Sequence, residues 1–164
     1  MLYYIYNMKK SLLALLALCT IAFAIKYPQF NFFTDAKAGK KYKIFDTEDQ
    51  TWFLQDLGNY AWDAAMKACP SGWRLPSNED WKKLEGFLAM NPELREEFRK
   101  NAKIKEEASL EQGVKASIGY WWSATEAEEI PSGAYFQFMY DGYNDMYEGY
   151  DPKNILRAVR CVKD

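Results

Sequence analysis

The sequence of 164 residues contains no histidine. Histidine is the usual general base near neutral pH and the commonest transition-metal ligand, so its absence excludes Ser-His-Asp and Cys-His catalysis and argues against a transition-metal site. Paired carboxylates such as Asp141 and Asp145 are the groups that glycosidases use, but acids in turns are ordinarily just solvated. We therefore expect a protein that is not an enzyme.

Long hydrophobic runs are confined to the first 24 residues. Met8-Lys9-Lys10 is a short basic segment, and the apolar residues 11–24 end in the small-x-small pattern Ala22-Phe23-Ala24. This pattern predicts a signal peptide over residues 1–24. A membrane span needs about 20 apolar residues, and this apolar run is shorter than that. We expect an exported protein, located in the periplasm, on the cell surface or in the medium, with no stable membrane span after cleavage.

Three alternatives remain open for this segment. Translation can begin at Met1 or at Met8, and the apolar run can be retained as an anchor. Cys19 is a candidate for lipid modification, although Leu18 stands where such signals carry a small residue.

Cysteine is scarce after the signal segment: residues 25–164 contain only Cys69 and Cys161. Two cysteines in an exported chain pair by default, so we predict a disulfide between them. The segment that is removed carries two lysines and no acid, which leaves 19 basic and 23 acidic residues. This acidic balance argues against nucleic acid as a partner, and the 140 residues left are enough for a single domain.

The first part of the mature chain predicts a lead-in, a hairpin and a helix. Residues 25–38 are interpreted as an irregular lead-in. Strands are expected at Lys41–Phe45 and Gln50–Leu54, with a turn between them. Asn59 is predicted to cap a helix over Tyr60–Ala68, which ends at the first cysteine.

The stretch CPSGWRLPSNEDW, residues 69–81, predicts an extended segment that leads into a second helix. Trp73 and Leu75 have the same parity in an extended chain and are expected to be buried, and Pro76 keeps the segment extended. Ser77 and Asp80 have capping-box spacing for a helix over about 78–89. Trp81 is expected to pack back against Pro76.

Arg74 lies between the two expected anchors and has two interpretations. It is either a cation that binds a ligand or, as we expect, a structural residue that joins loops through carboxylates or carbonyls. A third helix is expected from Asn91-Pro92-Glu93 to about Glu107. A strand over Tyr120–Thr125 and a loop through Gly133 follow.

The C-terminal part predicts a two-residue hairpin. Asp141-Gly142 separates strands over Ala134–Tyr140 and Tyr143–Gly149, which places Tyr140 opposite Tyr143 and Phe136 opposite Tyr147. We expect four aromatic residues in the core: Phe136, Phe138, Trp122 and Tyr147. A last strand over Ile155–Val162 carries Cys161.

Several motifs together resemble the Fibrobacter succinogenes major paralogous domain family, over about Gly39 to Asp164. They are Trp62-Asp63-Ala64-Ala65 with Cys69, Gly72-Trp73-Arg74-Leu75-Pro76-Ser77 with Asp80-Trp81, Trp121-Trp122-Ser123-Ala124-Thr125-Glu126, and Val159-Arg160-Cys161-Val162. The resemblance implies an α+β protein with a C-type-lectin-like fold. Such a fold has small twisted antiparallel sheets, flanking helices and a long loop region, and it also implies the Cys69–Cys161 bridge.

The sequence departs from this family and its superfamily in three places. A charged stretch over Glu93–Lys115 replaces a glycine-rich segment that members usually carry. Lectin-type calcium motifs are missing apart from a faint likeness at Tyr143-Asn144-Asp145, so we predict no cofactor and leave calcium open. The stretch Arg74-Leu75-Pro76-Ser77 with Asp80-Trp81 also resembles formylglycine-generating enzymes of the same superfamily, but the bridge would occupy the cysteines that their chemistry needs.

Recognition through aromatic residues remains as the expected function. Tyrosines among polar neighbours are typical of binding surfaces, because a rigid ring gives contact area at little entropic cost. The predicted ligand-binding residues lie at the hairpin tip: Tyr140, Asp141, Tyr143, Asn144 and Asp145. We expect a binding module for a surface glycan or protein; the alternative is a cell-envelope structural or self-assembling protein.

Overall fold

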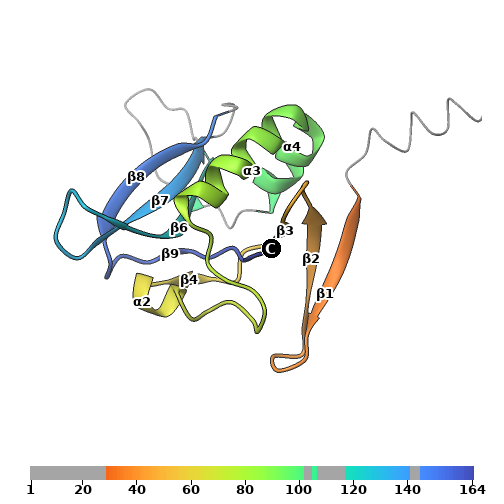
Figure 1. Cartoon of the computed structure of the whole chain (residues 1–164), viewed down its shortest axis with the longest axis horizontal. Helices are drawn as coiled ribbons and strands as arrows, with labels where there is room; N and C mark the ends of the chain where they lie inside the picture. The colour runs from red at the N-terminus through yellow and green to blue at the C-terminus, as the bar shows by residue number, and fades with distance from the viewer. Residues whose placement is uncertain (1–28, 102–104, 107–116, 141–144) are drawn as a thin grey trace, which may run out of the picture.

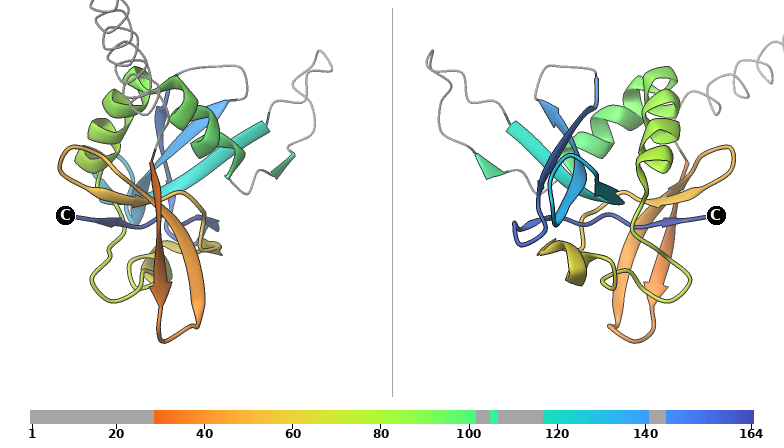
Figure 2. Two further views of the ribbon diagram at one scale, coloured as in Figure 1. Left: turned by 90° about the vertical axis from the view of Figure 1, so that its right-hand side faces the viewer. Right: turned by 60° about the vertical axis from the view of Figure 1, so that its left-hand side comes forward.

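The computed structural model describes residues 29–101, 105–106, 117–140 and 145–164. This part of the chain forms two largely antiparallel sheets and three helices, which confirms the predicted α+β class. Figures 1 and 2 show α3 (Asn78–Met90) and α4 (Pro92–Lys100) together on one side of the molecule, near both sheets. The predicted signal peptide lies outside the described residues.

The first sheet has the strand order β1-β2-β3-β10. Its strands are β1 (Phe30–Asp35), β2 (Lys40–Asp46), β3 (Thr51–Phe53) and β10 (Val162–Lys163). The predicted hairpin between β2 and β3 is confirmed, with Phe45 opposite Trp52. Both of these side chains are almost completely buried, which favours this register because a slip of one residue would move them to the opposite face of the sheet.

Strand β1 corrects the prediction of an irregular lead-in over residues 25–38. Its six residues pair with β2 in a continuous register, and the ring of Phe33 lies 5.2 Å from that of Trp73. The adjacent aromatic residues Phe32 and Phe33 point to opposite faces, so the segment lacks the alternation that marks a strand. Gly39 closes the turn with a φ of +64°, which a glycine adopts without strain.

The second sheet has the order β4-β9-β6-β7-β8, and β5 pairs with β6. Its strands are β4 (Asn59–Tyr60), β5 (Lys105–Glu106), β6 (Ser117–Ala127), β7 (Gly133–Tyr140), β8 (Tyr147–Pro152) and β9 (Arg157–Ala158). The predicted strand over Tyr120–Thr125 is present and is longer than expected. The loop that was expected to begin at Glu126 therefore begins after Ala127.

Helix α2 (Trp62–Ala65) is shorter than the predicted helix over Tyr60–Ala68, and Asn59 does not cap it. Asn59 and Tyr60 instead form β4, opposite Ala158 and Arg157. Ala61 takes the N-cap position without a side-chain hydrogen bond. The pairing of the backbone with the last part of the chain therefore outweighs the local capping signal of Asn59.

Helix α3 begins as the sequence predicts. The Ser77 side chain accepts a hydrogen bond from the backbone N–H of Asp80, and the Asp80 carboxylate accepts one from the backbone N–H of Ser77. This reciprocal capping box satisfies two backbone donors that a helix start leaves unpaired. Helix α3 buries Trp81, Leu84 and Leu88 on one face.

Helix α4 begins with Pro92 at its first turn but ends at Lys100, so the predicted extension to Glu107 is wrong. The Asn101 side chain donates to the backbone oxygen of Glu97 at 2.8 Å and occupies a carbonyl at the helix end. Lys105 and Glu106 then form β5 beside β6.

The pairing of β7 with β8 differs from the predicted two-residue hairpin. Phe138 lies opposite Tyr147 and Phe136 opposite Gly149, a register two residues away from the prediction. A shift of two residues keeps every side chain on its predicted face. The observed register places a glycine against the large ring of Phe136, where a Cβ would come within 2.6 Å of that ring.

The last part of the chain crosses from one sheet to the other, which corrects the prediction of one strand over Ile155–Val162. Ala158 lies beside Trp121 in the second sheet, and Val162 pairs with Trp52 in the first. Between them, the backbone N–H of Val159 donates to Gly58 and the backbone oxygen of Cys161 accepts from Phe53. The segment therefore joins the two sheets by main-chain hydrogen bonds.

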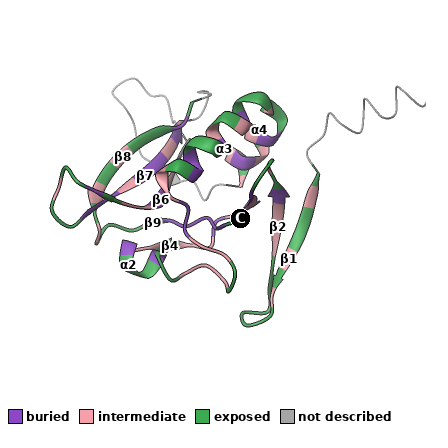
Figure 3. Cartoon of the chain, viewed as in Figure 1, coloured by how far each residue is buried: buried purple, intermediate pink, exposed green. Residues whose placement is uncertain are grey.

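Two hydrophobic clusters fill the interior, and Figure 3 shows the buried residues along the elements that meet there. The first cluster joins α3 and α4 to both sheets and contains Trp52, Trp81 and Trp121. The second lies around the disulfide and contains Trp62, Leu75 and Trp122. The expected anchors Trp73 and Leu75 are thus confirmed, with Trp73 partly buried and Leu75 fully buried.

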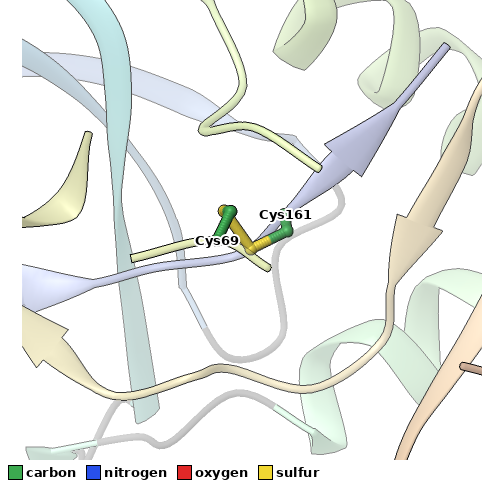
Figure 4. Close-up of a disulfide and its surroundings, with 2 residues drawn as sticks. All are labelled: Cys69 and Cys161. Carbon is green, nitrogen blue, oxygen red and sulfur yellow. A yellow bond between two sulfur atoms is a disulfide. The ribbon is translucent and has the colours of Figure 1, made fainter. Parts of the chain in front are cut away.

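The predicted disulfide between Cys69 and Cys161 is present and joins positions 92 residues apart (Figure 4). Cys69 follows α2, and Cys161 lies in the segment that crosses between the sheets. Cys161 is completely buried in the second cluster. Disulfides of this kind are typical of proteins that mature in an oxidising compartment outside the cytoplasm.

Candidate functional site

Arg74 is a structural residue, as expected. Its guanidinium binds both oxygens of Asp80, with the closest contact at 2.6 Å, and it also binds the Asp164 carboxylate at 2.6 Å. Asp80 additionally accepts hydrogen bonds from Ser77 and Gln50. Burial alone would raise the pKa of Asp80, but these hydrogen bonds outweigh it and hold the pKa well below its usual range.

Arg160 also has a structural role, because its side chain is fully buried against Asp56 at 2.6 Å. Its guanidinium donates to the backbone oxygen of Phe98 at 3.0 Å and lies over the rings of Phe98 and Trp121. Burial lowers the pKa of Arg160, while the charge of Asp56 opposes that shift. This ion pair connects the C-terminal segment to α4 and β6 and offers no access to a ligand.

The surface that best fits a binding site is the face of β6, β7 and β8 that belongs to the second cluster. Five aromatic side chains gather there, and we call this group the aromatic face. It consists of Tyr120 from β6, Phe136, Phe138 and Tyr140 from β7, and Tyr147 from β8. Phe138 is its centre, with ring centroids of the other four between 5.4 and 5.7 Å away.

The aromatic face grows more exposed away from the core. Phe136 is 8% exposed, whereas Tyr147 at the sheet edge is 36% exposed. The Tyr147 ring stacks on Phe138 with an interplanar angle of 27°, so it is held in place although solvent reaches it. A rigid, half-exposed group of rings offers contact area without a large loss of side-chain entropy on binding.

Arg157 borders the aromatic face and carries its positive charge. Its guanidinium lies 3.7 Å from the ring centroid of Phe136 and 4.6 Å from that of Tyr120. It also forms an ion pair with Asp151 of β8. Stacking on the rings holds the planar guanidinium in one orientation, so the Arg157–Asp151 pair places hydrogen-bonding groups beside an aromatic surface.

The opposite face of the β7–β8 ribbon differs in composition. Tyr150, which is 47% exposed, contacts Tyr135 edge to face. The Tyr135 hydroxyl donates to the Glu129 carboxylate at 2.6 Å, and this hydrogen bond raises the pKa of Tyr135 to about 12. Tyr147 and Tyr150 are thus exposed tyrosines on one strand that face opposite ways.

The predicted tip residues are only partly described. Tyr140 is half-buried within the aromatic face, and Asp145 is exposed just before β8. Asp141, Tyr143 and Asn144 lie outside the described residues. Tyr147 was expected in the core and is instead exposed, because the observed register places it at the edge of the sheet.

Sequence reasoning missed Tyr120 and Arg157 as members of this surface. Tyr120 has the same parity as Trp122 in β6, so the strand pattern alone could have placed it on the same face. No comparable signal identified Arg157, because its position depends on the short pairing of β9 with β4 and β6. The site is therefore built from strands distant in sequence.

The described residues contain no cluster of three or more His, Cys, Asp or Glu side chains that could hold a metal ion. None of the described helices is long and apolar enough to cross a membrane. A hollow of about 400 Å³ lies beside α3, where Lys83 and Asp49 form an exposed ion pair across it. The aromatic face remains the best-defined candidate for binding.

The comparisons with known proteins identify the family. The model of the Fibrobacter succinogenes major domain matches residues 29–116, from the residue before β1 to the residue before β6. This range begins earlier than the predicted start at Gly39 and does not include the aromatic face. No curated protein and no solved structure gives a significant match. Because the matched range covers more than half of the sequence, the chain belongs to the Fibrobacter succinogenes major domain family.

Proposed function

We propose that this protein is an exported, non-catalytic binding module that recognises a cell-surface or extracellular carbohydrate or protein. The observation that carries the proposal is the aromatic face, with its five rings around Phe138 and its bordering Arg157–Asp151 pair. Flat rings suit the faces of sugar rings as well as apolar side chains of a protein. The charged pair adds groups that hydrogen-bond hydroxyls or backbone amides.

A C-type-lectin-like fold is part of this proposal. Two helices beside two largely antiparallel sheets, and a disulfide from Cys69, which follows α2, to the last part of the chain, support it. The same disulfide occupies Cys69 and Cys161, which favours binding over chemistry of the formylglycine-generating type. Export is supported by the disulfide and by the signal pattern in residues 1–24.

The test compares two tyrosines of β8. Tyr147→Ala removes an exposed ring of the aromatic face, whereas Tyr150→Ala removes an exposed ring of the opposite face and serves as the matched control. The protein and both variants are screened against envelope glycans, plant polysaccharides and surface proteins, with and without calcium. We expect Tyr147→Ala to weaken binding by about tenfold, the loss of a contact of about 1.4 kcal/mol.

The melting temperature of each variant separates binding from folding. Loss of binding in Tyr147→Ala at an unchanged melting temperature supports the aromatic face as the site. Equal binding by Tyr147→Ala and the parent, or equal loss in both variants, contradicts it. Calcium dependence of the parent would add a metal ion to the site.

A further inference from the structure

Each sheet has two outer strands, β1 and β10 in the first and β4 and β8 in the second, and both β4 and β10 are only two residues long. Strand β1 ends the first sheet and β8 ends the second, and no other described strand pairs with their outer sides. Figures 1 and 2 show these strands on opposite sides of the molecule. An open edge presents backbone N–H and C=O groups that can pair with another chain. Strands β1 and β8, with six residues each, are the two longest of these outer strands and the best positions for adding another strand.

Strand β1 lacks the features that usually protect an edge. Its six residues include no proline and no lysine, and the register with β2 is continuous, without a bulge. Phe32, in the middle of the strand, is 60% exposed. Natural edge strands are commonly blocked by lysine, proline, a bulge or short length, so an unprotected aromatic edge indicates an association surface.

The positive charge beside β1 comes from β2 and the turn. The Lys41 ammonium lies 4.3 Å from the ring centroid of Phe32, and that of Lys43 lies 3.8 Å from Phe30. Lys37 and Lys40 extend the charge into the turn. None of these four lysines forms an ion pair within the described part of the chain. The two ammonium groups over β1 therefore place positive charge at its open edge, with no ion-pair partner among the described residues.

The charge beside β8 has the opposite sign. The sequence from residue 126 to residue 152 contains seven acids and no lysine or arginine: Glu126, Glu128, Glu129, Asp141, Asp145, Glu148 and Asp151. Glu126 and Asp151 pair with Lys153 and Arg157, whereas Asp145 and Glu148 are exposed and have no cationic partner among the described residues. The edge of β8 thus complements the edge of β1 in charge, and both edges carry exposed aromatic side chains.

We propose that the edge of β1 in one copy of this chain pairs with the edge of β8 in a second copy. The contact joins two different surfaces, so one copy of a pair keeps a free β8 edge, the other keeps a free β1 edge, and the association continues from copy to copy. Such association would make the protein self-assembling as well as a binding module. Glu148 of the proposed contact and Tyr147 of the aromatic face point to opposite faces of β8. The association therefore does not require a ligand on the aromatic face.

The first test measures the size of the protein in solution. The full chain, as its host produces it, is studied by sedimentation velocity over a range of concentrations at low salt and at about 1 M salt, where the Debye length falls to about 3 Å. We expect oligomers that grow with concentration at low salt and dissociate at high salt. A protein that stays monomeric at low salt overturns the proposal.

The second test uses two charge reversals that each disable one edge. Lys41→Glu with Lys43→Glu disables the β1 edge, and Asp145→Lys with Glu148→Lys disables the β8 edge. We expect each double variant to be monomeric alone. An equimolar mixture of the two should associate again and grow with concentration, because the two intact edges have opposite charges and the two reversed edges have opposite charges as well.

A matched control is Lys67→Glu with Lys82→Glu, which changes the net charge as the first variant does but lies outside both edges. This control should associate like the parent. If it becomes monomeric, net charge rather than the β1 edge governs association and the proposal fails. Self-association of either edge variant alone also overturns the proposal. A mixture that stays monomeric overturns it as well, and would assign the β1 edge to a different, acidic partner.

Discussion

At the scale of single residues, Asp80 has the most consequential environment among the charged side chains described. Its carboxylate caps α3 through Ser77 and binds Arg74 with both oxygens. Only 8% of its side chain is exposed, whereas 71% of the Asp164 side chain is exposed. The two acids share Arg74 as a partner, so they allow a buried and an exposed contact with the same cation to be compared.

We expect Asp80→Asn to destabilise the protein by about 2 to 3 kcal/mol, because it removes several hydrogen bonds to a buried charge. Asp164→Asn is the control and should cost less than about 1 kcal/mol, since exposed ion pairs contribute little. Urea unfolding of both variants measures the difference. Equal costs would show that burial of Asp80 is unimportant.

The contribution of Asp80 to stability should depend on pH. Its pKa is lowered on folding, so its stabilising effect is complete above the unfolded pKa of about 3.9 and is lost as the pH falls below that value toward the folded pKa. The gap in unfolding free energy between the parent and Asp80→Asn should therefore be constant from about pH 5 to 7 and narrow below about pH 4. A gap that widens on acidification contradicts this assignment.

At the scale of elements, two glycines should respond oppositely to the same substitution. Gly149 in β8 leaves room for the Phe136 ring, and a Cβ would lie 2.6 Å from that ring, whereas Gly86 in α3 has nothing within 4 Å. We expect Gly149→Ala to destabilise by about 1 to 3 kcal/mol through overpacking. Gly86→Ala should stabilise by up to about 1 kcal/mol through helix propensity. Thermal unfolding of both variants checks the two signs, and a stabilised Gly149→Ala would contradict the observed register.

The elements also show where sequence reasoning succeeds. The β2–β3 hairpin and the start of α3 follow from local signals, namely an alternating apolar pattern and a capping box. Asn59 and the Asp141-Gly142 pair are local signals as well, but distant partners overrule them. Asn59 pairs with Ala158, and the position of Gly149 opposite Phe136 selects a different register.

The same distinction applies to the candidate site. Tyr140 could be predicted because it lies in a clear strand. Phe136 and Phe138 occupy alternate positions of the same strand and therefore share its face with Tyr140. Arg157 could not be predicted, since it reaches Phe136 and Tyr120 only after β9 has joined the second sheet. Local sequence determines which residues share a face, whereas strand order determines which strands meet.

At the scale of the whole molecule, the crossing segment and the disulfide hold the two sheets together. Residues 158–162 pass from β6 to β3, and Cys161 in this segment is bonded to Cys69. The buried Arg160 anchors the same segment to Asp56. Three kinds of interaction, covalent, ionic and main-chain, therefore converge on five consecutive residues.

We expect the paired substitution Cys69→Ser with Cys161→Ser to lower the free energy of unfolding by about 4 to 5 kcal/mol, the chain-entropy estimate for a loop of this size. Urea unfolding of the full chain with and without reductant measures the same difference. Reduction should have no effect on the double variant, which serves as the control. A parent that is insensitive to reductant would show that the bridge contributes nothing to stability.

The position of the bridge also determines how the protein would respond to mechanical force. When tension acts on the two ends of the chain, the cystine carries the load directly from residue 69 to residue 161, and the 92 peptide units between them bear none. At about 3.5 Å per residue, the bridge prevents the extension of about 320 Å of chain between the two cysteines. The strands β6, β7 and β8, with the aromatic face, lie wholly inside this shielded length, so stretching the chain would peel away the N-terminal strands while the aromatic face stays outside the path of the force.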